Sequence, residues 1–128
     1  MKAKESKILS TPIPHDRLVE MTAERLASHG CAHVRASHPN RFRACDQIGD
    51  YIPDVTAFSG STLVVVEAES SDGLGETHTE EQWRTFHNHA SRVGDYFIAV
   101  VNKADEATAR ALLTRVCGNA ANARLWTF

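Results

Sequence analysis

The chain contains no long apolar run. None of its hydrophobic stretches approaches the roughly 20 residues that a membrane-spanning helix needs, so we expect no membrane anchor. Its basic N-terminal stretch lacks an apolar segment, so we also expect no secretory signal. The three cysteines, Cys31, Cys45 and Cys117, are an odd number without a CxxC pair. This pattern favours reduced thiols in a cytoplasmic protein over a disulfide framework or a structural zinc site.

Neither sign of charge dominates, because 14 Lys and Arg residues nearly balance 16 Asp and Glu residues and leave a net charge of -2. Bulk charge therefore does not indicate a nucleic-acid binder, although a local basic stripe remains compatible with one. Aromatic residues make up 7% of the chain and are little interleaved with basic ones, so base stacking on an aromatic platform is not indicated. The G-x-S-x-G and P-loop motifs are absent, and the histidines show no metal-ligand spacing.

The residues that are present predict one α/β domain spanning 1–128, with 1–13 as a flexible or extended N-terminal segment. Hydrophobic periodicity predicts helices within 10–30, 77–94 and 105–118, and strands within 31–38, 51–58, 62–70, 95–102 and 123–128. The order α-β-β-β-α-β-α-β favours a mixed central sheet flanked by helices on both faces. Thr79 is expected to cap the second helix, and Gln82 would complete a capping box. The expected core contains Val64, Val66, Trp83, Phe86, Phe97, Ala99 and Leu112.

The second and third strands read as a hairpin whose register follows from its turn. With Gly60 and Ser61 as a type II′ loop, Ser59 stands opposite Thr62. The same register, which a four-residue loop would keep, places Asp54 opposite Glu67, with Cβ atoms about 4.5–5.5 Å apart. Alternation then puts Glu69 on the same face as Glu67.

Three carboxylates are therefore expected at one end of one sheet face. Carboxylates this close repel one another and raise each other's pKa, and such a cluster is tolerated mostly when it holds a cation. Hard carboxylate oxygens suit Mg²⁺ or Mn²⁺. Two plainer interpretations stay open: the acids are solvated at the strand end, or they pair with Arg or His side chains.

A Pro-Asp pair, an apolar hairpin and a Glu-x-Glu triplet, here Pro53-Asp54 and Glu67-Ala68-Glu69, resemble the PD-(D/E)XK nuclease superfamily with its restriction-endonuclease-like fold. The resemblance covers most of the chain as an order of elements but only a few residues as a motif. It implies that Asp54 and Glu67 are metal-binding acids. The family usually has Lys where this chain has Glu69, and Glu69 would instead be a third metal ligand or a base for the attacking water.

The resemblance also implies auxiliary residues. Gln82 is a candidate catalytic residue near the start of the helix after the motif, and Arg84 on that helix is a candidate substitute for the missing Lys. The first helix would supply an acid, with Glu20 and Glu24 both open, and His78 would lie at the mouth of the site.

Arg35, Arg41 and Arg43 precede the first acid, Asp54. Of these, Arg41 and Arg43 are the candidate contacts to a nucleic-acid backbone, unless this segment is simply a solvated loop.

Three functions remain open at this point. The first is a Mg²⁺- or Mn²⁺-dependent nuclease acting on nucleic acid, with DNA the expected substrate and specificity supplied by a homodimer or a partner protein. The second is a non-catalytic member of the same fold that binds nucleic acid or assembles with proteins, because Glu69 replaces the Lys. The third is a small protein-interaction domain whose acids are solvated.

Overall fold

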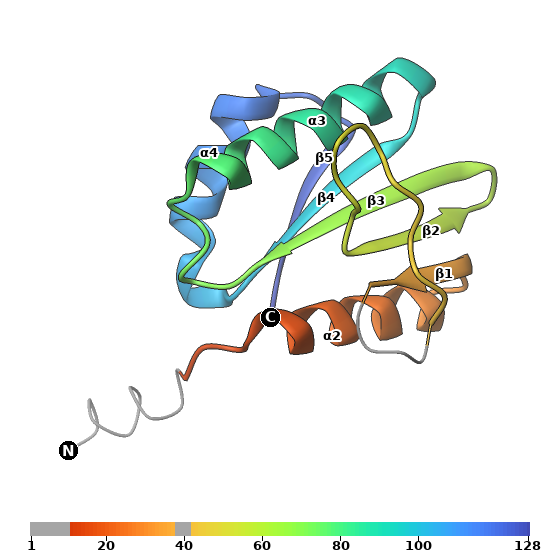
Figure 1. Cartoon of the computed structure of the whole chain (residues 1–128), viewed down its shortest axis with the longest axis horizontal. Coiled ribbons are helices and arrows are strands. Elements are labelled where there is room, and N and C mark those ends of the chain that lie inside the picture. The colour runs from red at the N-terminus through yellow and green to blue at the C-terminus, as the bar shows by residue number, and fades with distance from the viewer. Residues whose placement is uncertain (1–10, 38–41) are drawn as a thin grey trace.

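The computed structural model describes residues 11–37 and 42–128 as one α/β unit (Figure 1). Its elements follow the order that the sequence predicts, with one short 3-10 turn added before the last helix. They are α2 (His15–Ser28), β1 (Ala32–Ala36), β2 (Val55–Ser59), β3 (Thr62–Glu69), α3 (Thr77–Val93), β4 (Tyr96–Val101), η1 (Lys103–Asp105), α4 (Glu106–Cys117) and β5 (Ala123–Thr127). Within the expected N-terminal segment, Ile13 is bound through its backbone to the Asn102 side chain, at 2.6 Å and 3.0 Å. Residues 1–10 of that segment lie outside the described residues.

The five strands form one mixed sheet in the order β1-β2-β3-β4-β5. The β1–β2 and β2–β3 pairs are antiparallel, whereas β3–β4 and β4–β5 are parallel. The parallel pairs require crossovers, and α3 and α4 supply them. The mixed sheet with helices on both faces is therefore confirmed.

The β2–β3 hairpin has the predicted register. Ser59 pairs with Thr62 and Val55 pairs with Val66, and the backbone N–H of Asp54 donates to the carbonyl of Val66 at 3.1 Å. Gly60 has φ +62°, the left-handed value that the first loop position of a type II′ turn needs. A glycine at this position thus fixes which residues face each other along the whole hairpin.

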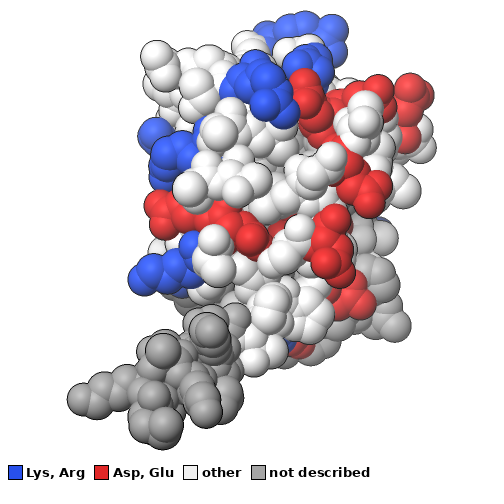
Figure 2. Space-filling view, turned by 90° about the vertical axis from the view of Figure 1, so that its left-hand side faces the viewer, with Lys and Arg blue, Asp and Glu red and all other residues white. Residues whose placement is uncertain are grey.

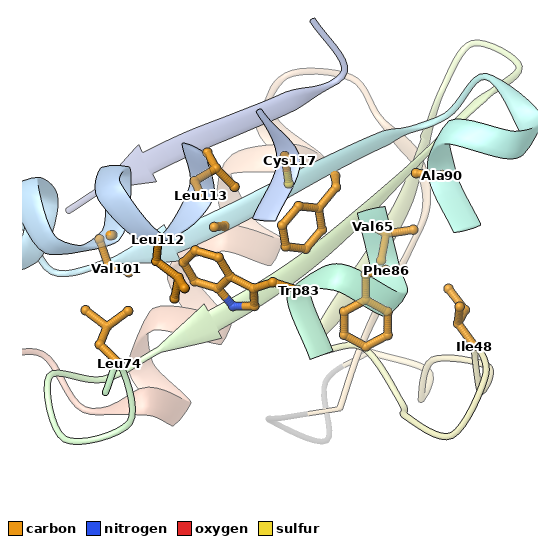
Figure 3. Close-up of a cluster of buried hydrophobic side chains, with 13 residues drawn as sticks. Ile48, Val65, Leu74, Trp83, Phe86, Ala90, Val101, Leu112, Leu113 and Cys117 are labelled. Carbon is orange, nitrogen blue, oxygen red and sulfur yellow. The ribbon is translucent and has the colours of Figure 1, made fainter. Parts of the chain in front are cut away.

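Two apolar cores lie on the two faces of the sheet (Figure 1). On one face α2 packs against Val64, Val66 and Ala68, and on the other face α3 and α4 pack against Val65. Figure 3 shows the second core, in which Trp83 of α3 lies near Leu112 of α4 and Phe86 of α3 lies beside Ile48. All seven residues expected in the core are buried.

The start of α3 differs from the sequence prediction. The helix begins at Thr77 with Glu76 as its N-cap, and Glu76 makes no side-chain capping bond. Thr79 is the third residue of the helix and is buried, and its hydroxyl donates to the Gly73 carbonyl at 2.8 Å. The predicted capping roles of Thr79 and Gln82 are therefore wrong, because the loop before the helix is held by Thr79 from inside the first turn.

In the described part of the chain, no helix is long and apolar enough to span a membrane.

Candidate acid site

The three predicted acids line one hollow at the carboxyl end of β3. Asp54, Glu67 and Glu69 surround it together with Ser70, Asp72, Gly73 and Glu76 of the following loop, His15 of α2, Ile52 before β2, and His78 and Gln82 of α3. Its volume is about 440 Å³. Figure 2 looks onto this side of the molecule, where acidic side chains form a band across the surface. Five acids and no Lys or Arg belong to the described lining, so the hollow is suited to a cation.

The acids are not solvated strand ends. Asp54 is 8% exposed, Glu67 4% and Glu69 9%. Asp54 Oδ2 accepts a hydrogen bond from the backbone N–H of Ala68 at 2.9 Å, and the same oxygen lies 3.1 Å from Nε2 of His15. The alternative of solvated acids is therefore wrong, while the alternative of pairing with a basic side chain holds for Asp54.

Glu67 is the most deeply buried of the acids and the least satisfied. Its Oε1 atom has no hydrogen-bond partner among the described residues, and the only other buried side-chain polar atom in that condition is Nε1 of Trp83. Burial raises the pKa of the Glu67 carboxyl well above its ordinary value, and the charges of Asp54 and Glu69 raise that pKa further. Without a cation, the protonated form of Glu67 is thus favoured.

Glu69 is held against the loop that follows β3. Its Oε1 atom occupies the space beside Gly73, where an added Cβ would lie 2.1 Å away. Burial raises the pKa of the Glu69 carboxyl and Asp54 adds to the rise, while His15 and His78 oppose it. Gly73 therefore makes room for the third carboxylate.

His15 is the site residue that sequence reasoning missed. Its Nε2 meets Asp54 and its Nδ1 lies 3.1 Å from Asp16, while the side chain remains about one-third exposed. The hydrogen bond to Asp54 raises the pKa of His15 to about 9, although partial burial lowers it. The only signal in the sequence was the position of His15 at the start of the helix that precedes the hairpin, since 39 residues separate it from Asp54.

The structure brings some auxiliary candidates to the hollow and leaves others away from it. Gln82 and His78 line it, and His78 also lies 3.6 Å from Glu76. Glu20 forms an ion pair with Arg17, and Glu24 lies 3.9 Å from the same guanidinium. Among the described residues, His15 is the residue of α2 that lines the hollow, and neither Glu20 nor Glu24 belongs to the lining.

Arg84 and Arg43, the two basic candidates among the described residues, do not line the hollow either. Arg84 pairs with Glu80 at 3.1 Å, and Arg115 of α4 joins the same carboxylate at 2.9 Å. Arg43 is exposed, and its backbone carbonyl accepts from the N–H of Ala36 at 2.8 Å. Arg41 lies outside the described residues. Among the described residues, no Lys or Arg side chain therefore lines the hollow to take the place of the Lys that PD-(D/E)XK nucleases usually carry where this chain has Glu69.

The donor chemistry of the hollow fits Mg²⁺ or Mn²⁺, because carboxylate oxygens predominate and Glu67 Oε1 is unpartnered. As they stand, however, no three His, Cys, Asp or Glu side chains in residues 11–37 and 42–128 are grouped closely enough to hold a metal ion. Asp54 Oδ2 is engaged by His15 and by the Ala68 N–H. Metal binding would therefore require the side chains of the three acids to close together.

Comparison of this chain with models of known protein families, with characterised proteins and with solved structures finds no match.

Proposed function

We propose that the protein is a metal-dependent nuclease whose acid hollow hydrolyses phosphodiester bonds of nucleic acid, with DNA the expected substrate. The observation that carries the proposal is the unpartnered, buried Oε1 of Glu67 beside Asp54 and Glu69. An isolated buried carboxylate is costly, and a bound cation would offset that cost. The resemblance to the PD-(D/E)XK nucleases and the antiparallel hairpin followed by a parallel β-α-β unit support a restriction-endonuclease-like assignment.

Asp54, Glu67 and Glu69 would hold the cation, which polarises a phosphate and lowers the pKa of a bound water when present. The amide of Gln82 would position the attacking water or a phosphate oxygen by hydrogen bonding. Glu69 would either remain a ligand or take the proton of the water. His78, at the exposed edge of the hollow, is available to a leaving-group oxygen.

The second candidate is a non-catalytic member of the same fold that binds nucleic acid or assembles with a protein partner. The observation that favours it is the lining itself, which has five acids and no Lys or Arg among the described residues. A cation opposite the phosphate contributes strongly to transition-state stabilisation, so its absence would reduce or abolish cleavage. Metal binding without cleavage would support this candidate.

A thermal-shift titration with Mn²⁺ tests the cation site. Because a ligand that binds only the folded state stabilises it by mass action, saturating Mn²⁺ at 100 times its Kd should add about 2.7 kcal/mol to the free energy of unfolding. Asp54→Ala should abolish the rise in Tm. Asp50→Ala, which removes an exposed acid from the preceding loop, is the control and should keep it. An unchanged Tm of the parent protein would contradict the proposal.

Glu69→Lys separates the two candidates. It restores the residue that the family usually carries, so a nuclease that merely lacks its Lys should show new or greater Mg²⁺-dependent cleavage of DNA. If Glu69 is itself an essential ligand, the same variant should lose both the Mn²⁺-induced rise in Tm and any cleavage. A parent protein that binds Mn²⁺ but cleaves no DNA, with Glu69→Lys also inactive, would support the non-catalytic candidate.

A further inference from the structure

A second hollow lies on the same sheet face as the acids. It is bounded by β1, β2, the start of β3, α3 and the loop before β2, and its volume is about 440 Å³. His33, Arg35, Phe58 and His89 are among its lining residues, which include no side chain of the acid hollow. Its size falls within the roughly 300–1,000 Å³ typical of small-ligand sites.

A β-bulge places the basic side chains in this second hollow. Ala32 pairs with Phe58, but Arg35 rather than Val34 pairs with Thr56, because one extra residue is inserted in β1. Residues directly opposite each other share a face, so the bulge turns Arg35 toward the hollow and leaves Val34 against the α2 core. His33 adopts φ +53°, a value uncommon for a non-glycine residue, and its ring lies edge-on to Phe58 with centroids 6.2 Å apart. The chain thus adopts a strained backbone where His33 and Arg35 face Phe58.

The groups in the second hollow are free to meet a ligand. Phe58 is 37% exposed although it lies on a sheet face that is otherwise covered by α3 and α4. Arg35 pairs with Asp46 at 3.2 Å, but the Asp46 side chain is 90% exposed. An ion pair with so exposed an acid is weak, so a phosphate oxygen can replace the carboxylate.

The two hollows are aligned along β2. Asp54 lines the acid hollow, and Thr56 and Phe58 line the second one, since alternate residues of a strand share a face. At about 3.3 Å per residue, Asp54 and Phe58 are roughly 13 Å apart along the chain. A few nucleotides of an extended strand span such a distance. Ile52, an exposed apolar residue just before β2, also lines the acid hollow.

We propose that the second hollow is a base pocket that takes an unstacked base of single-stranded nucleic acid, near the phosphate held at the acid hollow. The Phe58 ring stacks on the base, and Arg35 pairs with the adjoining phosphate, while His33 and His89 offer ring nitrogens to the base edge. The choice of nucleic acid as ligand rests on the proposed nuclease function. The pocket requires an unpaired base, so the substrate is single-stranded or locally opened.

The test is binding of a fluorescein-labelled oligothymidylate, followed by anisotropy in EDTA so that cleavage plays no part. Phe58→Ala should raise Kd about 5- to 150-fold, the equivalent of the roughly 1–3 kcal/mol that one stacked base contributes. Tyr96→Ala is the matched control, because Tyr96 is 38% exposed but lines the hollow on the opposite sheet face, and its Kd should stay within twofold of the parent value. His89→Ala, a helix-compatible change in the same pocket, should also weaken binding. Oligouridylate and a DNA duplex are the further arms, and duplex binding should be insensitive to Phe58→Ala.

Equal losses in Phe58→Ala and Tyr96→Ala, or no binding of either single strand by the parent protein, would overturn the base pocket. Circular dichroism melts of both variants check that they fold. The result is separable from the nuclease proposal, because that proposal is tested by Mn²⁺ at the acid hollow. Mn²⁺-dependent cleavage with unchanged binding by Phe58→Ala would refute the pocket alone, whereas selective loss of binding without any Mn²⁺ effect would refute the nuclease alone.

Discussion

Glu67 lies almost fully enclosed on a strand whose neighbouring inward positions are valines and alanine. One of its oxygens is unpartnered, and the nearby charges of Asp54 and Glu69 disfavour its ionised form. An apolar residue of similar size at this position would remove that cost, since replacing buried charges by well-packed apolar groups is often stabilising. Stability alone thus does not explain the acid, and this agrees with the proposal that Glu67 binds a cation.

Gly73 allows a test of the third carboxylate without touching it. In Gly73→Ala the new Cβ would lie 2.1 Å from Oε1 of Glu69, and the flexible end of that side chain is the atom that must move. We expect the variant to fold but to lose most of the Mn²⁺-induced rise in Tm, because Glu69 is displaced from the hollow. The measurement is the same thermal-shift titration.

Gly75→Ala is the matched control for this substitution. Gly75 belongs to the same loop, and an added Cβ there would meet nothing within 4 Å. Its Mn²⁺ response should equal that of the parent protein. If Gly73→Ala also kept the full response, Glu69 would not be a ligand and the cation site would be reduced to Asp54 and Glu67.

At the scale of elements, α3 joins the core to the site. Trp83 and Phe86 are fully buried against β4, where both rings lie near Phe97 with centroids 6.0 Å and 6.4 Å away. Gln82, beside Trp83 in the helix, lines the acid hollow. The packing of the aromatic face therefore fixes where the amide of Gln82 lies.

Phe86→Ala measures this docking. Loss of a fully enclosed ring leaves a cavity, so we expect the free energy of unfolding to fall by about 3–5 kcal/mol in urea denaturation. Val93→Ala, at a site 60% exposed near the end of the same helix, should change it by less than about 0.5 kcal/mol. A loss below about 1 kcal/mol in Phe86→Ala would mean that α3 does not dock through this face.

At the scale of the whole molecule, the buried titratable groups act on stability in the same direction. The pKa of His15 is raised from 6.5 to about 9, so its contribution is complete below pH 6.5 and is lost as the pH rises through 9. The pKa of Glu67 is raised above its ordinary 4.5, so the folded state keeps a proton that the unfolded state releases, and stability falls as the pH rises above 4.5. Both effects therefore lower the stability of the folded state as the pH rises from acidic values toward pH 9.

We therefore predict that the metal-free protein is less stable at pH 9 than at pH 5.5, as measured by urea denaturation at each pH. Glu67→Gln should raise stability at neutral and alkaline pH, because the amide stays neutral, and should flatten the pH dependence. Glu76→Gln, which neutralises an exposed acid at the rim of the same hollow, should leave the profile nearly unchanged. A parent protein whose stability rises steadily from pH 5.5 to pH 9 would contradict the electrostatic description of the hollow.

The sequence by itself determined the sheet, the hairpin register and the gathering of Asp54, Glu67 and Glu69. These features depend on short-range rules: strand alternation assigns faces, and the Gly60 turn fixes which residues stand opposite one another. The helix faces that carry Trp83 and Phe86 followed from periodicity in the same way.

Only the tertiary structure decided which side chains surround the acids and what lies beside them. His15 reaches Asp54 across 39 residues, and Arg84 pairs with Glu80 rather than approaching the hollow. The aromatic and basic groups of the proposed base pocket, which no sequence pattern connects, come together through a bulge in β1. These contacts depend on how α2 and α3 are set on the sheet and on one inserted residue in a strand, and packing between distant segments fixes both.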